Sequence, residues 1–179
     1  MLPLILFKMK KIFTLLFTII ATTIFAQDSL KSKLALEGTA DVYFRKTLSS
    51  SKNIAPGTSF ANLNGFSLGM FNLISSYESG KTGFVADLVF GPRGEDAVFL
   101  STGNSSIVNQ LYTYWNVNNT ITLTMGNFNT FLGYEVISPS GNFNYSTSYM
   151  FSYGPFSHSG LKADFTLAND FTAMLGILN

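Results

Sequence analysis

The residue types that most often carry catalysis or metal binding are few in this chain and stand apart from one another. His158 is the only histidine, and the sequence holds no cysteine. A metal site needs several such ligands at matched spacing, and no H-x-x-x-H or paired-carboxylate pattern accompanies His158. Ser146 and Ser148 lie among aromatic residues, without the histidine and acid that a serine nucleophile requires. The sequence therefore indicates no enzyme activity, no metal and no cofactor.

Two further groups of residues could bind a ligand, and each has a plainer interpretation. Glu95 and Asp96 are adjacent acids that could hold a divalent cation or the counter-ions of lipopolysaccharide, but a solvated loop accounts for them as well. The aromatic residues within 145–153 could contact a carbohydrate, or they could pack against the rest of the protein. Neither group identifies a site by itself.

Other charged residues alternate with apolar ones along extended segments. In residues 34–45, for example, Leu36 and Val42 point to one side, while Asp41 points to the other. If such segments are strands of a β-barrel that spans a membrane, one side of each strand faces lipid and the other faces the lumen. On the lipid side at mid-bilayer, a Lys or Arg costs roughly 2–4 kcal/mol, and an acid costs less. The alternation therefore predicts which charged residues face a water-filled lumen: Glu37, Asp41, Arg45, Asp87, Lys162 and Asp164.

Seven segments with this period-two pattern would form the strands that position those charges. Each is close to the ~10 residues that a tilted strand needs to cross a bilayer. The second segment changes phase near Met70 and Phe71, which suggests a β-bulge. The predicted fold is all-β, the N-terminal part of an antiparallel transmembrane β-barrel with about seven strands visible. The segments are residues 34–45, 66–77, 83–91, 107–115, 121–128, 159–167 and 171 to the end.

The connections between these segments alternate strictly between long and short. Outer-membrane barrels have short periplasmic turns and long extracellular loops, so strand parity requires this order. Residues 145–153 could be taken for a strand, but an extra strand would break the parity, so we interpret 129–158 as one long third loop. The predicted long connections are 46–64, 92–106 and 129–158, and the short ones are 78–82, 116–120 and 168–170.

The third long loop is too apolar to lie freely in water. Its aromatic and aliphatic side chains must pack, and the barrel interior is the nearest surface. We therefore expect the loop to fold inward and narrow the pore, although it could instead cap the barrel or contact a partner. Glu135 is its one charged residue. A carboxylate in a narrow passage of low dielectric constant would favour cations, which makes Glu135 the constriction candidate.

The composition suits a protein whose exterior meets lipid. Charged residues make up 12 % of the chain, against roughly 25 % in a typical soluble domain. Phenylalanine and tyrosine are abundant, with 18 and 8 copies. The formal net charge of +1 gives no reason to expect a nucleic-acid partner.

The N-terminus has the pattern of a secretory signal peptide. Basic residues precede a short apolar run, and Ala26 then precedes a polar stretch. A membrane-spanning helix is the alternative, but the run falls short of the ~20 residues such a helix needs. We expect a signal peptide over residues 1–26 with cleavage after Ala26, and a barrel part over residues 27–179. Whether Met1 or Met9 is the true start stays open.

Several blocks of the sequence are familiar together: FVADL at 84–88 with FGPRG at 90–94, GNF at 126–128 before GYE at 133–135, NYSTSY at 144–149, and GPF at 154–156 with HSGLKAD at 158–164. They resemble the outer-membrane β-barrel porin-2 (OmpL-like) family, over roughly residues 34–179. The resemblance implies a porin-like barrel that passes small solutes. Because family members are usually longer and barrels generally end on an aromatic residue, the chain, which ends at Asn179, is expected to be the N-terminal portion, with the C-terminal half missing or the gene product truncated.

These observations favour an outer-membrane porin for passive diffusion of small solutes. The alternatives are a non-channel outer-membrane barrel with an adhesive or structural role and a secreted glycan-binding β-sandwich. Expected partners are outer-membrane lipid and lipopolysaccharide, the barrel-assembly machinery and small solutes. The sequence does not fix the solute, the ion selectivity, the total strand number or the oligomeric state.

Overall fold

The computed structural model describes residues 32–48, 60–98, 103–168 and 171–179. The predicted signal peptide, with its cleavage point after Ala26, lies outside these residues. Residues Lys33–Asn179 fold as one unit. Among the described residues, no helix combines the length and the apolar character needed to cross a membrane.

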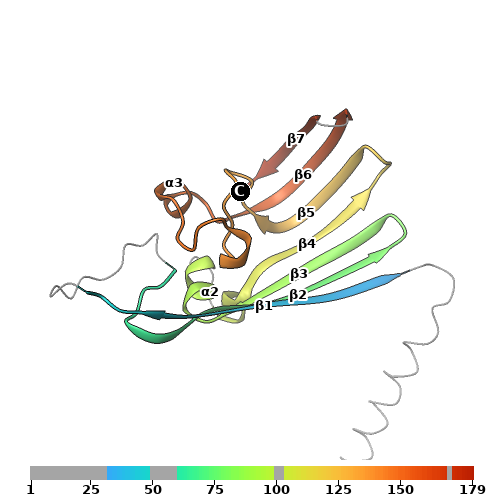
Figure 1. Ribbon diagram of the computed structural model, residues 1–179. Coiled ribbons are helices and arrows are strands. Elements are labelled where there is room, and N and C mark those ends of the chain that lie inside the picture. The colour runs from blue at the N-terminus through green and yellow to red at the C-terminus, as the bar shows by residue number, and fades with distance from the viewer. Residues whose placement is uncertain (1–31, 49–59, 99–102, 169–170) are drawn as a thin grey trace, which may run out of the picture. The chain divides into compact units, whose positions relative to one another are not determined.

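Seven antiparallel strands form a single sheet in which each strand pairs with its neighbours in chain order (Figure 1). Strands β1 and β7 are the two edges, so the sheet is open. The predicted all-β fold with seven antiparallel strands is confirmed. The strands are β1 (Lys33–Arg45), β2 (Gly65–Ser79), β3 (Thr82–Phe90), β4 (Val108–Asn116), β5 (Ile121–Asn129), β6 (Ser157–Ala168) and β7 (Phe171–Leu178).

The long and short connections alternate as the sequence predicted. We call the long ones loop 1 (residues 46–64), loop 2 (residues 91–107) and loop 3 (residues 130–156). The described parts of these loops gather at one end of the sheet, and the tight turns after β2 and β4 lie at the other end (Figure 1). Within the described residues, the helical turns belong to the long loops: α2 (Pro92–Ala97) and η1 (Gly103–Ile107) in loop 2, and η2 (Pro139–Gly141) and α3 (Tyr149–Tyr153) in loop 3. Residues 145–153 are therefore not a strand, as predicted.

The predicted bulge in β2 is confirmed. Ala40 pairs with Phe71 and Val42 pairs with Leu68, so Gly69 and Met70 together lie opposite one residue of β1. The extra residue reverses the alternation of β2. Leu68 and Phe71 thereby share the exposed face, while Met70 is 3 % exposed on the opposite face.

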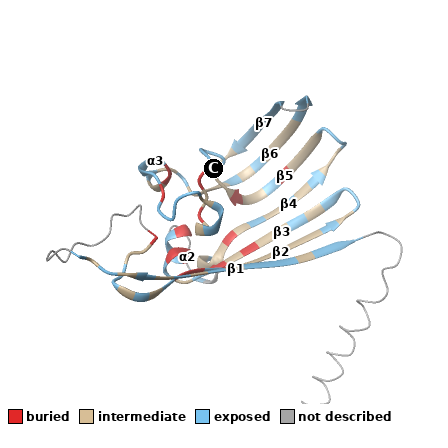
Figure 2. Cartoon of the chain, viewed as in Figure 1, coloured by how far each residue is buried: buried red, intermediate tan, exposed pale blue. Residues whose placement is uncertain are grey.

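The two faces of the sheet differ in the way a lipid-embedded barrel requires. The outer face carries large apolar side chains that no other part of the chain covers: Leu36 is 69 % exposed and Val42 is 70 % exposed. A soluble sheet would bury such a face, because each side chain left in water forfeits roughly 1.5–3 kcal/mol. The inner face carries the polar residues of the strands and receives loops 2 and 3, where most buried residues gather (Figure 2).

Aromatic side chains flank an aliphatic band on the outer face. Tyr77 and Phe84 stack near the short turns, with ring centres 5.7 Å apart. Near the long loops, Phe44 and Phe66 lie 4.8 Å apart. Phe66 and Tyr77 are eleven residues apart on β2, which at ~3.3 Å per residue and a tilt of ~40° gives a height of about 28 Å. That height is close to the ~25 Å apolar band of outer-membrane barrels, which aromatic girdles border.

Candidate pore wall and constriction loop

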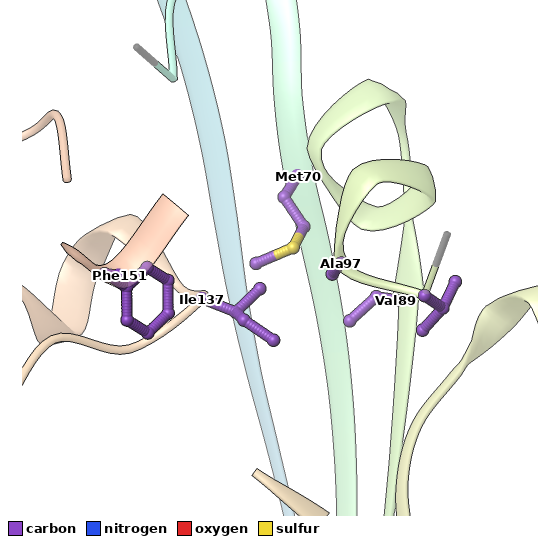
Figure 3. Packing of buried hydrophobic residues seen from close by; sticks show 6 residues of the cluster. Met70, Val89, Ala97, Ile137 and Phe151 are labelled. Atoms are coloured by element: carbon purple, nitrogen blue, oxygen red, sulfur yellow. The ribbon is translucent and has the colours of Figure 1, made fainter. Parts of the chain in front are cut away.

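Loop 3 crosses the inner face from one side of the sheet to the other. It leaves β5 and returns to β6, yet the hydroxyl of Tyr145 donates a 2.7 Å hydrogen bond to Oδ2 of Asp41 on β1. Ile137 and Phe151, which are 2 % and 3 % exposed, anchor it by packing with residues of the strands and of loop 2. Ile137 lies at the centre, with Phe151 on one side and Met70 and Ala97 on the other (Figure 3). Loop 3 therefore packs onto the sheet rather than projecting away from it.

The carboxylate of Glu135 holds loop 3 in its fold. Glu135 is 7 % exposed and accepts hydrogen bonds from the backbone N–H of Ser148, at 2.8 Å, and from the Ser148 hydroxyl. Ser148 in turn caps α3 by accepting a hydrogen bond from the N–H of Phe151. The predicted cation-attracting role of Glu135 stays a prediction, and the structure adds that this carboxylate organises the loop.

The bulge in β2 makes room for the contact between Asp41 and Tyr145. A Cβ atom added to Gly69 would lie 1.7 Å from Oδ2 of Asp41, so any side chain there displaces the carboxylate. Burial of Tyr145 is the largest cause of the rise in its pKa above the usual value of 10, and the hydrogen bond to Asp41 adds to it. Both effects favour the neutral hydroxyl, which can donate to Asp41. Gly69 and Asp41 thus fix where loop 3 meets β1.

Replacing Gly69 with alanine is expected to release the end of loop 3 that contacts β1. The new methyl group would displace the Asp41 side chain, so Tyr145 would lose its acceptor, although the strand pairing would persist. A cysteine in place of Ile137, which is 2 % exposed in loop 3, leaves Tyr145 intact and should then react with a water-soluble thiol reagent severalfold faster in a Gly69→Ala background than in a Gly38→Ala background. Gly38 is the matched control because its Cβ atom would contact nothing nearer than 3.4 Å. Equal rates in the two backgrounds would contradict the proposed role of Gly69.

The six charged residues predicted for the lumen all lie on inner-face positions of their strands, but few of them are free to meet a solute. Arg45 donates to the carbonyl oxygens of Ala61 and Asn62 in loop 1, at 3.4 and 3.1 Å. Lys162 pairs with Asp164 at 2.7 Å, and their side chains are 21 % and 41 % exposed. Asp41 accepts the hydrogen bond of Tyr145, and Asp87 is buried. Within the described residues, Glu37 is therefore the one of the six that is both exposed and without an ion pair.

Asp87 is the centre of a buried cluster of amide side chains. It is 2 % exposed and accepts from Nδ2 of Asn72 at 3.0 Å and from Nδ2 of Asn109 at 2.5 Å. Gln110 adds a longer contact of 3.4 Å. Asn109 is the extra residue of a second bulge, where the register shifts between Asp87 and Leu88, and this brings two neighbouring amides of β4 to one carboxylate. Three donors compensate for removing the charge from water.

His158, the only histidine of the chain, contacts residues of loop 3 at the point where the loop joins the sheet. Nε2 of His158 lies 3.1 Å from the hydroxyl of Thr130, and its ring stacks on Phe131 with centres 4.6 Å apart. His158 and Thr130 sit where loop 3 joins β6 and β5, so the contact closes the base of the loop. In the part of the chain that the structure describes, no three histidine, cysteine or acidic residues gather in a way that could hold a metal ion.

Comparison with known proteins agrees with this arrangement. The model of the family described as "Putative beta-barrel porin-2, OmpL-like" matches residues 33–179. The chain belongs to this family. The match begins at the first residue of β1 and includes the whole sheet and the three long loops. No curated protein and no solved structure matched the chain. Membership confirms the resemblance found in the sequence and points to a porin-like barrel of the outer membrane rather than to an enzyme.

The inner side of the sheet and the loops that cover it also contain buried polar residues that the sequence analysis did not single out. Arg93 in α2 is 6 % exposed and lies over the ring of Phe60, with Cζ 4.1 Å from the ring centre. Burial lowers its pKa to about 10, partly offset by the nearby charge of Asp96. Asn72 and Asn109, which hold Asp87, were likewise not selected. Their signal was an amide at an inward position of an apolar strand, where an unpaired polar group would be costly.

Proposed function

We propose that the protein is a weakly selective diffusion porin that passes small, water-soluble solutes across the outer membrane. The observation that carries the proposal is the polarity of the two faces of the sheet, which is the reverse of that in a soluble protein. The outer face is apolar and exposed, and the inner face is polar and is crossed by loop 3. A lipid-facing exterior together with a long loop held inside fits a channel with a constriction. The proposal includes export through a cleaved signal peptide over residues 1–26 and insertion by the barrel-assembly machinery. Its outer-face contacts would be outer-membrane lipid and lipopolysaccharide.

The charges left accessible on the inner face support a preference for cations. Glu37 is exposed, and the side chain of Asp164 is about twice as exposed as that of its partner Lys162, at 41 % against 21 %. Lys33 and Glu78 are also exposed on this face, but they lie opposite each other at the short-turn end and balance in charge. Acidic groups therefore predominate in the charge that a solute would meet between loop 3 and the short turns. Charge in a confined passage is weakly screened, so even a small excess of acid affects the permeating ion.

Cysteine labelling tests which face of the sheet meets water. The chain has no cysteine, so a single introduced thiol is the only target. In protein reconstituted into vesicles, Glu37→Cys and Asp164→Cys are expected to react with a membrane-impermeant maleimide at least tenfold faster than the matched outer-face variants Leu36→Cys and Ala163→Cys. If the outer-face cysteines react quickly and the inner-face cysteines do not react, the assignment of the two faces is reversed.

The close packing of loops 2 and 3 over β2 and β3 favours one second candidate. With Val89 and Asp87 only 1 % and 2 % exposed, the loops could seal the barrel, which would then act as a non-channel surface protein in adhesion or structure. Single-channel recording in a planar bilayer separates the two functions. Discrete conductance steps support the porin, and a silent but inserted protein supports the non-channel barrel.

A further inference from the structure

Arg93 occupies a position where all three long loops meet. It belongs to loop 2, and its guanidinium group lies close to an aromatic ring of loop 1 and to one of loop 3. Cζ of Arg93 is 4.1 Å from the ring centre of Phe60 and 5.6 Å from that of Phe156. Both distances are within the ~6 Å over which a cation attracts the face of an aromatic ring. Two aromatic residues distant in the sequence thus lie within reach of one cationic side chain.

The hydrogen bonding of Arg93 shows that the rings, rather than an acid, hold it. Nε and Nη2 are buried and find no acceptor among the residues that the structure describes. These two nitrogens form one edge of the guanidinium group, the edge that usually grips a carboxylate. Asp96 is the acid that favours the charge of Arg93, but within the described residues the two make no ion pair. Within the described residues, the printed partners of the cation are therefore the two aromatic rings.

The helix that carries Arg93 is fixed to the sheet. A Cβ atom on Gly94 would come within 3.2 Å of Val89, so α2 lies directly against β3. Ala97 of the same helix packs in the buried cluster with Met70 and Ile137. Arg93 consequently extends from a rigid base toward loops 1 and 3.

A second set of contacts links loops 1 and 3 beyond Arg93. The ring of Phe60 meets the ring of Tyr145 edge-on, with centres 5.6 Å apart, and Tyr145 is bonded to Asp41 on β1. The ring of Phe156, the second aromatic partner of Arg93, stacks on the ring of Phe151 in α3, with centres 5.3 Å apart. The chain of contacts runs from β3 through Arg93 to β1 and to α3.

We propose that Arg93 is the positioning residue that holds loops 1 and 3 against helix α2, which packs on the sheet, and so sets the width of the constriction. We call this arrangement of Arg93, Phe60 and Phe156 the clamp. The clamp rests on the proposed porin function for its effect on permeation, but not for its effect on the loops. It assigns to a planar cation a task that an ordinary hydrophobic contact does not fulfil, because one buried charge is attracted to the faces of two rings that belong to different loops.

The test measures the opening of loop 3 directly. Ile137→Cys places the only thiol of the chain at a position that is 2 % exposed, so its labelling rate in vesicles reports how often loop 3 leaves the sheet. Adding Arg93→Ala is expected to raise that rate at least tenfold. Guanidinium ion at millimolar concentration should restore slow labelling by entering the space between the two rings, and methylammonium at the same concentration should not.

Two further variants keep the test decisive. Arg93→Met fills the space without a planar cation, so it should label faster than the parent and should not respond to guanidinium. Lys81→Ala, which removes a positive charge at a short turn on the opposite end of the sheet, should label like the parent. Labelling of Arg93→Ala or Arg93→Met within twofold of the parent would overturn the clamp, as would fast labelling of Arg93→Ala without guanidinium rescue.

A conductance measurement on the same variants separates the clamp from the porin function. Arg93→Ala should open the pore to a larger conductance, and guanidinium should reverse the change. If labelling and its rescue follow the prediction while no variant conducts, the clamp stands and the porin proposal fails.

Discussion

Replacing the central part of loop 3 with a short turn is expected to raise the single-channel conductance severalfold and to weaken cation preference. Loop 3 packs through Ile137 and Phe151 and reaches as far as Asp41 on β1, so its removal clears a large part of the inner face. The conductance of a narrow passage is governed by its most constricted section. The comparison is made in planar bilayers between the parent and a variant in which residues 132–154 are replaced by a Gly-Ser turn.

Glu135→Gln is the informative companion to that deletion. The carboxylate accepts from the backbone and the hydroxyl of Ser148, and hydrogen bonds to a charged group contribute about 1.5–3 kcal/mol. The amide would lose part of this, so loop 3 should open more often and the current should fluctuate between two levels. Unchanged conductance in the deletion would show that loop 3 is not the constriction, whatever the companion variant does.

The strands and their faces could be predicted because each rests on local alternation. Leu36, Val42 and Asp41 show the pattern within one strand, and parity then fixes which links are long. The β2 bulge was also visible, because Leu68 and Phe71 cannot share a face without an extra residue. The inward position of loop 3 followed from its apolar content, which water would not tolerate.

The partners of the charged residues could not be predicted in the same way. That Tyr145 would find Asp41, 104 positions away, depends on how far loop 3 extends across the sheet, and nothing in either strand encodes that distance. Arg93 was hidden for a related reason, since its environment comes from Phe60 and Phe156 on two other loops. A charged residue in a loop is usually solvated, so no sequence pattern indicated that this one is buried.

The open edges of the sheet illustrate the same limit at the level of the fold. β1 and β7 each present an edge that is unpaired within the described residues, although an exposed edge is a template for further pairing. With seven strands in alternating directions, β1 and β7 run the same way. Strands that close this sheet by antiparallel pairing must therefore be odd in number, whatever their source. Local alternation predicts each strand but says nothing of that closure.

Asp87→Asn is expected to destabilise the folded protein by about 2–4 kcal/mol, far more than the same change at Asp164. The carboxylate of Asp87 accepts from the side-chain amides of Asn72, Asn109 and Gln110, and it is 2 % exposed. An asparagine offers one oxygen and one NH2 group, so at least one buried donor would face another donor. Because the side chain is buried, exposure to bulk solvent does not relieve the mismatch.

Asp164→Asn is the matched control, since it removes the same charge from the same face of the sheet. The side chain of Asp164 is 41 % exposed and its one ion pair is with Lys162, so its loss should cost no more than about 1 kcal/mol. Urea unfolding of the protein from lipid vesicles, followed by the fluorescence of Trp115, the only tryptophan, measures both variants. Equal stability losses would mean that the Asp87 carboxylate is accessible to water in the folded barrel and that the amide cluster does not depend on its charge. A large loss at Asp87 alone would establish it as a structural anion of the wall, leaving Glu37 and Asp164 as the acids that meet the permeating ion.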